Sequence, residues 1–186
     1  MKQIYLVLTI SFLLVGCGGS SEVQKYSDSE EISVPFSESK YMSNNDYFRA
    51  KQNGKSPNLA TAKKIAMLNA KTALAGSIKS TIKSVTDQYT NQATVGDKVE
   101  FENKFEELSR DVIEQTLNDV RVIGDKIFEG SKGGYTYWVA IEMSTKPVLE
   151  GVTTKISKDD KLKLDYDKKK FEEIFNKEME KLSNEK

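Results

Sequence analysis

The sequence contains no histidine and a single cysteine, Cys17, in 186 residues. Histidine is the commonest general base and the commonest metal ligand, so its absence disfavours much acid–base and metal chemistry. The 28 lysines and arginines balance the 28 aspartates and glutamates, so no overall basic excess favours a nucleic acid partner. We therefore expect no enzymatic activity, no cofactor, no metal site and no nucleic acid partner.

The lone cysteine follows a short apolar leader. Met1–Gln3 carry one positive charge, and Ile4–Val15 form an apolar run. This division is typical of a secretory signal peptide, and the run is shorter than the roughly 20 residues that a membrane-spanning helix needs.

The residues Leu14-Val15-Gly16-Cys17 resemble the lipobox of bacterial lipoproteins at all four positions. The resemblance implies that residues 1–16 are removed, that the Cys17 sulfur carries diacylglycerol, and that the new amino terminus carries a further acyl chain such as palmitate. Several acyl chains anchor a protein firmly, because each buried methylene contributes about 0.8 kcal/mol. The alternatives are an ordinary signal peptide followed by a chance cysteine, or a retained anchor.

Gly18, and not aspartate, follows the predicted lipidation site. In a Gram-negative cell, resemblance to known lipoproteins then implies sorting to the outer membrane. We expect a lipoprotein of the bacterial cell envelope, held on the membrane through Cys17.

Four segments are predicted in the chain. Residues 1–16 are the signal peptide, and residues 17–45 form a flexible tether rich in serine and glutamate. Residues 46–145 form the folded domain, and residues 146–186 a charged linker with an amphipathic C-terminal helix. Within the tether, residues 32–36 could form a short edge strand, and Pro35 argues against a central one.

The folded domain is expected to belong to the α+β class. A long alanine-rich helix and a second helix would pack on a small antiparallel sheet, in the order β-α-α-β-β-α once the C-terminal helix is included. The predicted elements are a strand at Tyr47–Gln52, a helix from Asn58 to about Tyr89 that Ser56 caps, a helix from about Val99 to Leu117, a hairpin of Val120–Glu129 and Tyr135–Ser144, and a helix from about Tyr166 to Leu182.

The second arm of the hairpin alternates with a period of two. We expect Tyr137, Val139 and Ile141 to face the helices and Trp138 to lie on the opposite face. Residues 151–164 are polar and are predicted to be extended. The C-terminal helix could pack on the domain or meet a partner.

A family resemblance rests on Ser56-Pro57-Asn58, on the alanines of the long helix and on the aromatic second arm of the hairpin. The residues concerned are Ser56-Pro57-Asn58, Ala62, Ala66, Asn69-Ala70, Leu74-Ala75 and Tyr135-Thr136-Tyr137-Trp138-Val139-Ala140-Ile141. From Tyr47 to Met143 the chain resembles the LPP-twenty family of small outer-membrane or surface lipoproteins, whose fold also occurs in a flagellar assembly protein. The resemblance implies helices packed on one face of a small antiparallel sheet, and it assigns no catalytic residues.

Three functional hypotheses follow. The first is a non-enzymatic structural or binding role with an unidentified envelope protein as partner, and the second is an assembly factor of a motility or secretion apparatus. The third, a hydrolase using carboxylates or a Ser/Lys pair, requires a deep pocket with at least two converging titratable groups. Glu106 and Glu107 are adjacent on a helix, so they point about 100° apart and are expected to be solvated.

Overall fold

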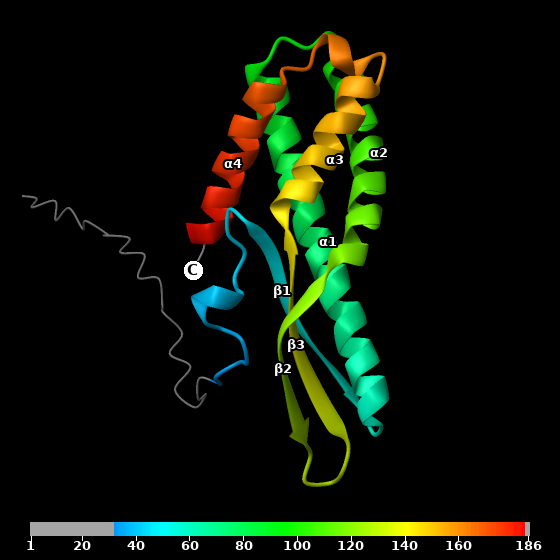
Figure 1. Cartoon of the computed structure of the whole chain (residues 1–186), viewed down its shortest axis with the longest axis vertical. Coiled ribbons are helices and arrows are strands. Elements are labelled where there is room, and N and C mark those ends of the chain that lie inside the picture. The colour runs from blue at the N-terminus through cyan, green and yellow to red at the C-terminus, as the bar shows by residue number, and fades with distance from the viewer. Residues whose placement is uncertain (1–31, 185–186) are drawn as a thin grey trace, which may run out of the picture. The chain divides into compact units, whose positions relative to one another are not determined.

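The structure is a computed structural model that describes residues 32–184 (Figure 1). The signal peptide predicted at residues 1–16 and the lipidation site predicted at Cys17 lie outside the described residues. Ser33–Lys186 form one compact unit.

Four helices and a three-stranded antiparallel sheet make up this unit. In chain order they are β1 (Tyr47–Ser56), α1 (Leu59–Gln92), α2 (Lys98–Thr116), β2 (Arg121–Glu129), β3 (Tyr135–Ser144), α3 (Thr145–Lys158) and α4 (Lys168–Asn184). Short 3-10 turns lie at Ser39–Tyr41, Leu117–Asp119 and Leu162–Leu164. The strand order is β1-β3-β2. The predicted α+β class and the predicted order of elements are confirmed, with α3 as one further helix.

The first half of α1 lies directly on the sheet because its contact residues are small. Ala62, Ala66 and Ala70 are fully buried. On the facing strand, a Cβ atom on Gly54 would lie 2.4 Å from the Ala62 carbonyl oxygen and 2.5 Å from the Ala66 nitrogen. The two backbones therefore touch with no side chain between them.

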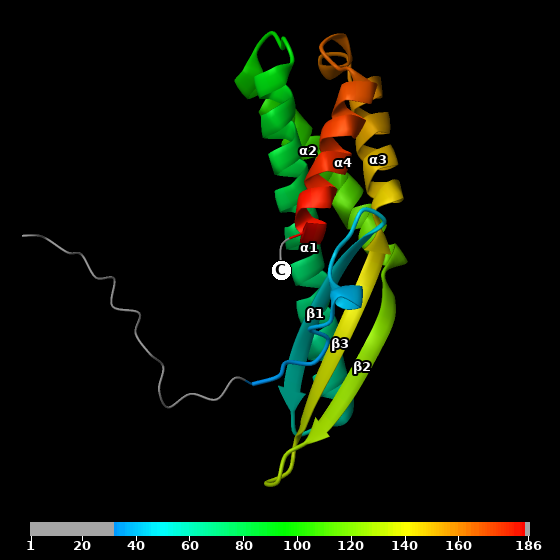
Figure 2. The ribbon, with the colours of Figure 1, turned by 90° about the vertical axis from the view of Figure 1, so that its left-hand side faces the viewer.

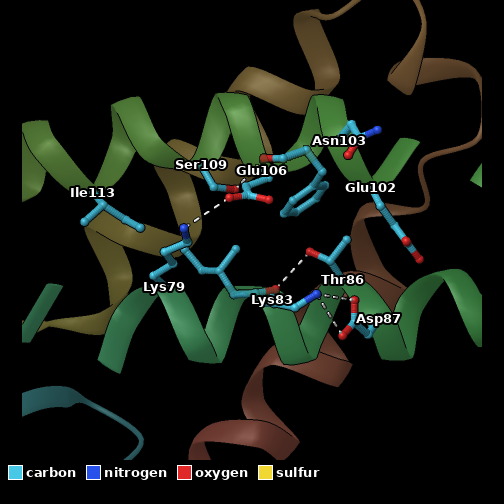
Figure 3. A pocket seen from close by; sticks show the side chains of 11 residues that line it. Lys79, Lys83, Thr86, Asp87, Glu102, Asn103, Glu106, Ser109 and Ile113 are labelled. Carbon is cyan, nitrogen blue, oxygen red and sulfur yellow. Dashed lines mark hydrogen bonds and ion pairs between the residues drawn. The ribbon is translucent and has the colours of Figure 1, made fainter. Parts of the chain in front are cut away.

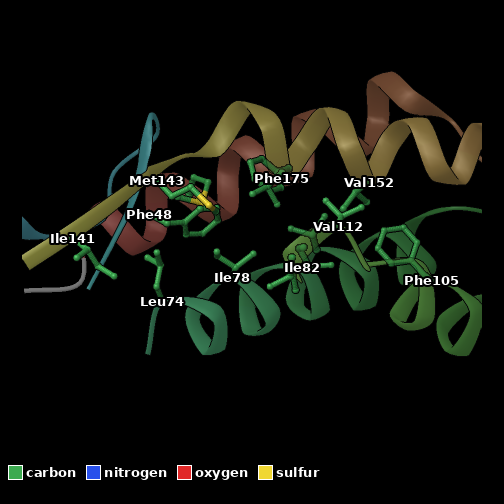
Figure 4. Packing of buried hydrophobic residues seen from close by; sticks show 14 of the residues in the cluster. Phe48, Leu74, Ile78, Ile82, Phe105, Val112, Ile141, Met143, Val152 and Phe175 are labelled. Atoms are coloured by element: carbon green, nitrogen blue, oxygen red, sulfur yellow. The ribbon is translucent and has the colours of Figure 1, made fainter. Parts of the chain in front are cut away.

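The second half of α1 extends beyond the sheet and carries larger apolar residues. Leu74 lies against Phe48 and Ile141 of the sheet, and Ile78 and Ile82 follow it in a row toward the other three helices (Figure 4). Phe105 and Val112 come from α2, Val152 from α3 and Phe175 from α4. Figures 1 and 2 show the result: a helical bundle at one end and the sheet at the other, with α1 running through both.

The two faces of the sheet differ as the alternation predicted. Tyr137, Val139 and Ile141 are at most 8% exposed and belong to the core against α1. Trp138 is half-buried on the opposite face. We call this opposite face, directed away from α1, the outer sheet face.

The cap of α1 differs from the prediction. Asn58, and not Ser56, is the N-cap, and its side-chain oxygen accepts a hydrogen bond from the Thr61 backbone at 3.1 Å. The Ser56 hydroxyl instead accepts from the Asn58 backbone at 3.1 Å. Both residues are good caps, and the longer β1 holds Ser56 within the strand.

The prediction of an extended segment at residues 151–164 is wrong, because α3 occupies most of these residues. Pro147 lies in the first turn of this helix, where its missing N–H costs no hydrogen bond. Gly151 faces α2, and a Cβ atom there would lie 2.7 Å from a methyl group of Val112. Gly151, which suggested a linker in the sequence, therefore allows α3 to pack closely on α2.

The C-terminal helix α4 packs on the domain. Phe171, Ile174 and Met179 of the predicted stripe are at most 4% exposed. Glu178 accepts hydrogen bonds from Ser84 at 2.6 Å and from Gln88 at 2.8 Å, both on α1. Residues 145–184 thus belong to the same compact unit as the domain predicted at 46–145.

Residues 33–45, predicted as part of the tether, pack against the outer sheet face. Phe36 is 3% exposed, and its ring stands edge-on to Tyr41 with centroids 4.8 Å apart. Gly124, next to a β-bulge in β2, makes room for this ring, because a Cβ atom there would lie 2.8 Å from it. The edge strand considered at residues 32–36 is not formed.

The contact between α1 and β1 predicts opposite effects of two identical changes. Gly54→Ala would force a methyl group against backbone atoms and should lower the free energy of unfolding by about 3 kcal/mol. Gly76→Ala in α1 meets open space and should raise it by about 1 kcal/mol through helix propensity. Urea unfolding of both variants measures the difference, and equal effects would contradict the close contact.

Candidate functional site

The described residues offer no metal centre. Within residues 32–184 there is no group of three or more aspartate, glutamate, cysteine or histidine side chains placed to hold a metal ion. The predicted lipidation site, Cys17, is not among these residues. Two features are candidates for a functional site: a groove between two helices, and an ion-pair cluster around Glu142 on the outer sheet face.

The groove lies between α1 and α2 and encloses a cavity of about 120 Å³ (Figure 3). Ile82, Phe105 and Ile113 contribute its apolar lining, and charged residues from both helices form its rim.

The titratable groups of the groove are paired with one another. Lys79 Nζ lies 3.1 Å from a carboxylate oxygen of Glu106, and Arg110 lies 3.7 Å from the same oxygen. The hydrogen bond from Lys79, together with its charge, lowers the pKa of Glu106. Glu107 pairs instead with Lys104 at 3.0 Å, so the two adjacent carboxylates do not converge.

The hydroxyl groups of the groove are also occupied. Ser109 donates a hydrogen bond to the Phe105 carbonyl at 2.8 Å, and Thr86 donates to the Ile82 carbonyl at 2.9 Å. A hydroxyl that donates to its own helix is not activated by a neighbouring base. Chemically, the groove can hold a small apolar group beneath an ionic rim.

The strongest charge cluster is on the outer sheet face. Glu142 is 5% exposed and receives an arginine from each neighbouring strand. Arg49 Nε lies 2.8 Å from one carboxylate oxygen, and Arg121 contacts the other at 2.6 Å. The three residues stand directly opposite one another in register across β1, β3 and β2. Each oxygen of the Glu142 carboxylate thus contacts a guanidinium group, and the negative charge is neutralised from both sides.

This cluster also fixes the segment before β1. Arg49 Nη1 donates to the Met42 carbonyl at 2.7 Å, and the Arg49 backbone donates to the Ser43 hydroxyl at 2.9 Å. Lys51 donates to the Phe36 carbonyl at 3.0 Å. The point where the chain enters the compact unit is therefore held on the outer sheet face.

A second buried polar group lies at the far end of the bundle. The Tyr89 hydroxyl donates to the Asp165 carbonyl at 2.8 Å and accepts from the Asp167 backbone at 2.7 Å. The neighbouring Tyr166 hydroxyl is buried and has no hydrogen-bond partner within residues 32–184. Burial raises the pKa of both phenols.

Sequence reasoning missed the Glu142 cluster. The alternation of β3 placed Glu142 on the outer face, where exposure was the natural expectation. Arginines on the outer positions of β1 and β2 and a glutamate on an outer position of β3 are a signal for a cross-strand ion pair. Only the register of the strands shows that Arg49 and Arg121 flank the same carboxylate.

Comparison with known proteins adds no family. No protein-family model matches the chain, and no curated protein matches it in sequence. In the part of the chain that the structure describes, no helix is both long and apolar enough to cross a membrane.

The paired burial of Glu142 predicts a large cost for removing its charge. Glu142→Gln should lower the free energy of unfolding by about 3 kcal/mol, because two guanidinium groups lose their counter-charge. Glu107→Gln removes an exposed ion pair and should change it by less than about 0.5 kcal/mol. Chemical denaturation compares the two, and a Glu142→Gln effect as small as the control would refute a structural role for the cluster.

The two tyrosines predict effects of opposite sign. Tyr166→Phe removes an unpartnered buried hydroxyl and should stabilise the fold by about 1 kcal/mol, whereas Tyr89→Phe breaks two hydrogen bonds and should destabilise it by about 1 kcal/mol or more.

The advantage of Tyr166→Phe over the parent should grow at alkaline pH. The raised pKa of a buried phenol means that its contribution to stability is lost as the pH rises above the ordinary value of 10.0. Tyr166→Phe removes this loss, so its advantage over the parent should grow between pH 9 and pH 11 in urea titrations. A constant difference over that range would contradict the burial of the Tyr166 hydroxyl.

Proposed function

We propose that the protein is a lipid-anchored lipoprotein of the bacterial cell envelope, most simply of the outer membrane, with a non-enzymatic structural or binding role. The observation that carries the proposal is the run Leu14-Val15-Gly16-Cys17 after a short apolar leader. Gly18 at the next position supports the outer membrane over the inner one.

The organisation of the compact unit supports this proposal. The unit begins at Ser33, sixteen residues after Cys17, so a spacer separates the anchor from the folded body. The body has its own continuous core, formed by all four helices and the sheet. Such a body needs no contribution from the membrane to fold.

The resemblance to the LPP-twenty family is part of the same proposal. It implies helices on one face of a small antiparallel sheet, and α1 lies on one face of the β1-β3-β2 sheet. The aromatic strand that carries the resemblance, β3, is the central strand and provides Tyr137, Val139 and Ile141 to the core.

A non-enzymatic role is supported by the state of the reactive groups described above. Glu106 and Lys79 neutralise each other at the rim of the groove, and Ser109 and Thr86 donate to their own helices. Glu142 is enclosed between two arginines. None of these groups is free to exchange a proton with a substrate.

The anchor predicts a specific change in cellular distribution. Cys17→Ala should move the protein from the membrane fraction to the soluble fraction of the envelope, because no sulfur remains to accept lipid. Ser20→Ala, outside the lipobox, should leave the distribution unchanged. Fractionation and mass spectrometry of the purified amino terminus measure both effects. A Cys17→Ala protein distributed like the parent, or a native amino terminus that carries no lipid, would refute the proposal.

A further inference from the structure

The outer sheet face carries an excess of positive charge, although the chain as a whole has no net charge. Its outward positions follow from the strand register. They are Tyr47, Arg49, Lys51, Asn53 and Lys55 on β1, Thr136, Trp138, Ala140, Glu142 and Ser144 on β3, and Arg121, Gly124, Lys126 and Phe128 on β2. Five of these residues are cations, and Glu142 is the single acid, whereas the whole chain has equal numbers of both.

Only part of this face is covered. Residues 33–45 run over this face from its middle, where Phe36 lies against Gly124, toward the end nearest the helical bundle (Figure 2). The other end, toward the loop that joins β2 and β3, presents Lys55, Lys126, Phe128, Thr136 and Trp138. We call these five residues the open basic face.

The side chains of the open basic face combine cations with aromatic rings. Lys55 and Lys126 are exposed, and Phe128 is 47% exposed. Lys126 lies at the border of the covered part, with Nζ 5.6 Å from the centre of the Phe36 ring. Trp138 lies between the two lysine-bearing strands, opposite Asn53 and Lys126 in register. Such a surface is complementary to a layer that carries negative charge outside and apolar groups just beneath.

Chain connectivity limits how far the proposed anchor can lie from this face. The chain reaches the compact unit at Ile32, which is 82% exposed, and Phe36 is already seated on the outer sheet face. Ile32 follows Cys17 by fifteen residues, which span at most about 50 Å. A lipid on Cys17 would therefore keep the membrane within reach of the face on which the chain enters.

We propose that the open basic face docks on an anionic phospholipid surface. Lys55 and Lys126 contact headgroup phosphates, and Trp138 and Phe128 lie at the level of the headgroups and the first methylenes. This inference rests on the proposed function for its membrane, and it adds the orientation of the body: sheet toward the lipid and helical bundle away from it.

The test uses a protein without lipid, so that docking is measured apart from anchoring. Residues 17–186 with Cys17→Ala contain the whole compact unit. Trp138 is the only tryptophan of the chain, so its fluorescence reports on this face alone. The protein is titrated with vesicles of phosphatidylglycerol and phosphatidylcholine in equal parts, and separately with vesicles of pure phosphatidylcholine.

With the anionic vesicles, the Trp138 emission should shift to shorter wavelength and be quenched by lipids brominated near the headgroup. Both effects should be weak with pure phosphatidylcholine and should fade as salt increases. Lys55→Glu with Lys126→Glu removes two lysines and should weaken partitioning by about 25-fold or more, at about fivefold per lysine.

The matched control changes the same charge elsewhere. Lys64 and Lys169 are exposed residues of α1 and α4, and Lys64 lies about 200° around the helix from the buried Ala62. Lys64→Glu with Lys169→Glu should leave partitioning within about twofold of the parent. Circular dichroism and urea unfolding verify that both double variants are folded.

Three outcomes would overturn docking: no change in Trp138 emission with anionic vesicles, equal partitioning of the two double variants, or a response to soluble polyphosphate with none to vesicles. The last would identify a soluble polyanion as the ligand. Because the tested protein carries no lipid, these outcomes are independent of the fractionation of Cys17→Ala, and either proposal can fail while the other stands.

Discussion

The backbone contact between α1 and β1 determines the rest of the architecture. Gly54 leaves no space for a side chain, and Ala62 and Ala66 allow the helix to lie on the strand. Alanine buries little apolar area, so this contact is held by close dispersion contacts more than by the area removed from water. It fixes the direction of α1 along the sheet.

The length of α1 then creates a requirement for further helices. Its 34 residues extend about 51 Å, whereas the ten residues of β1 extend about 33 Å. The overhang carries Ile82, Val85 and Tyr89, whose side chains are buried where α2, α3 and α4 surround them. A domain ending at residue 145 would expose this stripe, so α3 and α4 are part of the minimal fold.

The sequence predicts those elements whose periodicity is strong. The alternation of Tyr137, Val139 and Ile141 and the alanine seam of α1 define the sheet face, the long helix and the α+β class. The helix at 145–158 escapes prediction because Gly151 and Pro147 suggest a break, while their actual roles are contact with Val112 and a place in the first turn. Those roles depend on a neighbour that the local sequence does not contain.

The candidate sites also differ in whether the local sequence is enough to predict them. The lipidation site proposed at Cys17 is predicted from four consecutive residues, because a processing signal is a local sequence and requires no fold. The Glu142 cluster depends on strand register, which joins Arg49 to a residue 93 positions away, and the groove depends on the packing of α1 against α2.

Burying an unpaired carboxylate costs free energy of folding, so Glu142 can be buried only because both arginines pair with it. It lies beside the residues that hold the entering chain, since Arg49 binds both Glu142 and the Met42 carbonyl. A pull on the amino terminus is thus resisted at the outer sheet face by ionic and backbone contacts, and not by the bundle core. Lys51 donates to the Phe36 carbonyl on the same face, so the entering chain is held there at two points.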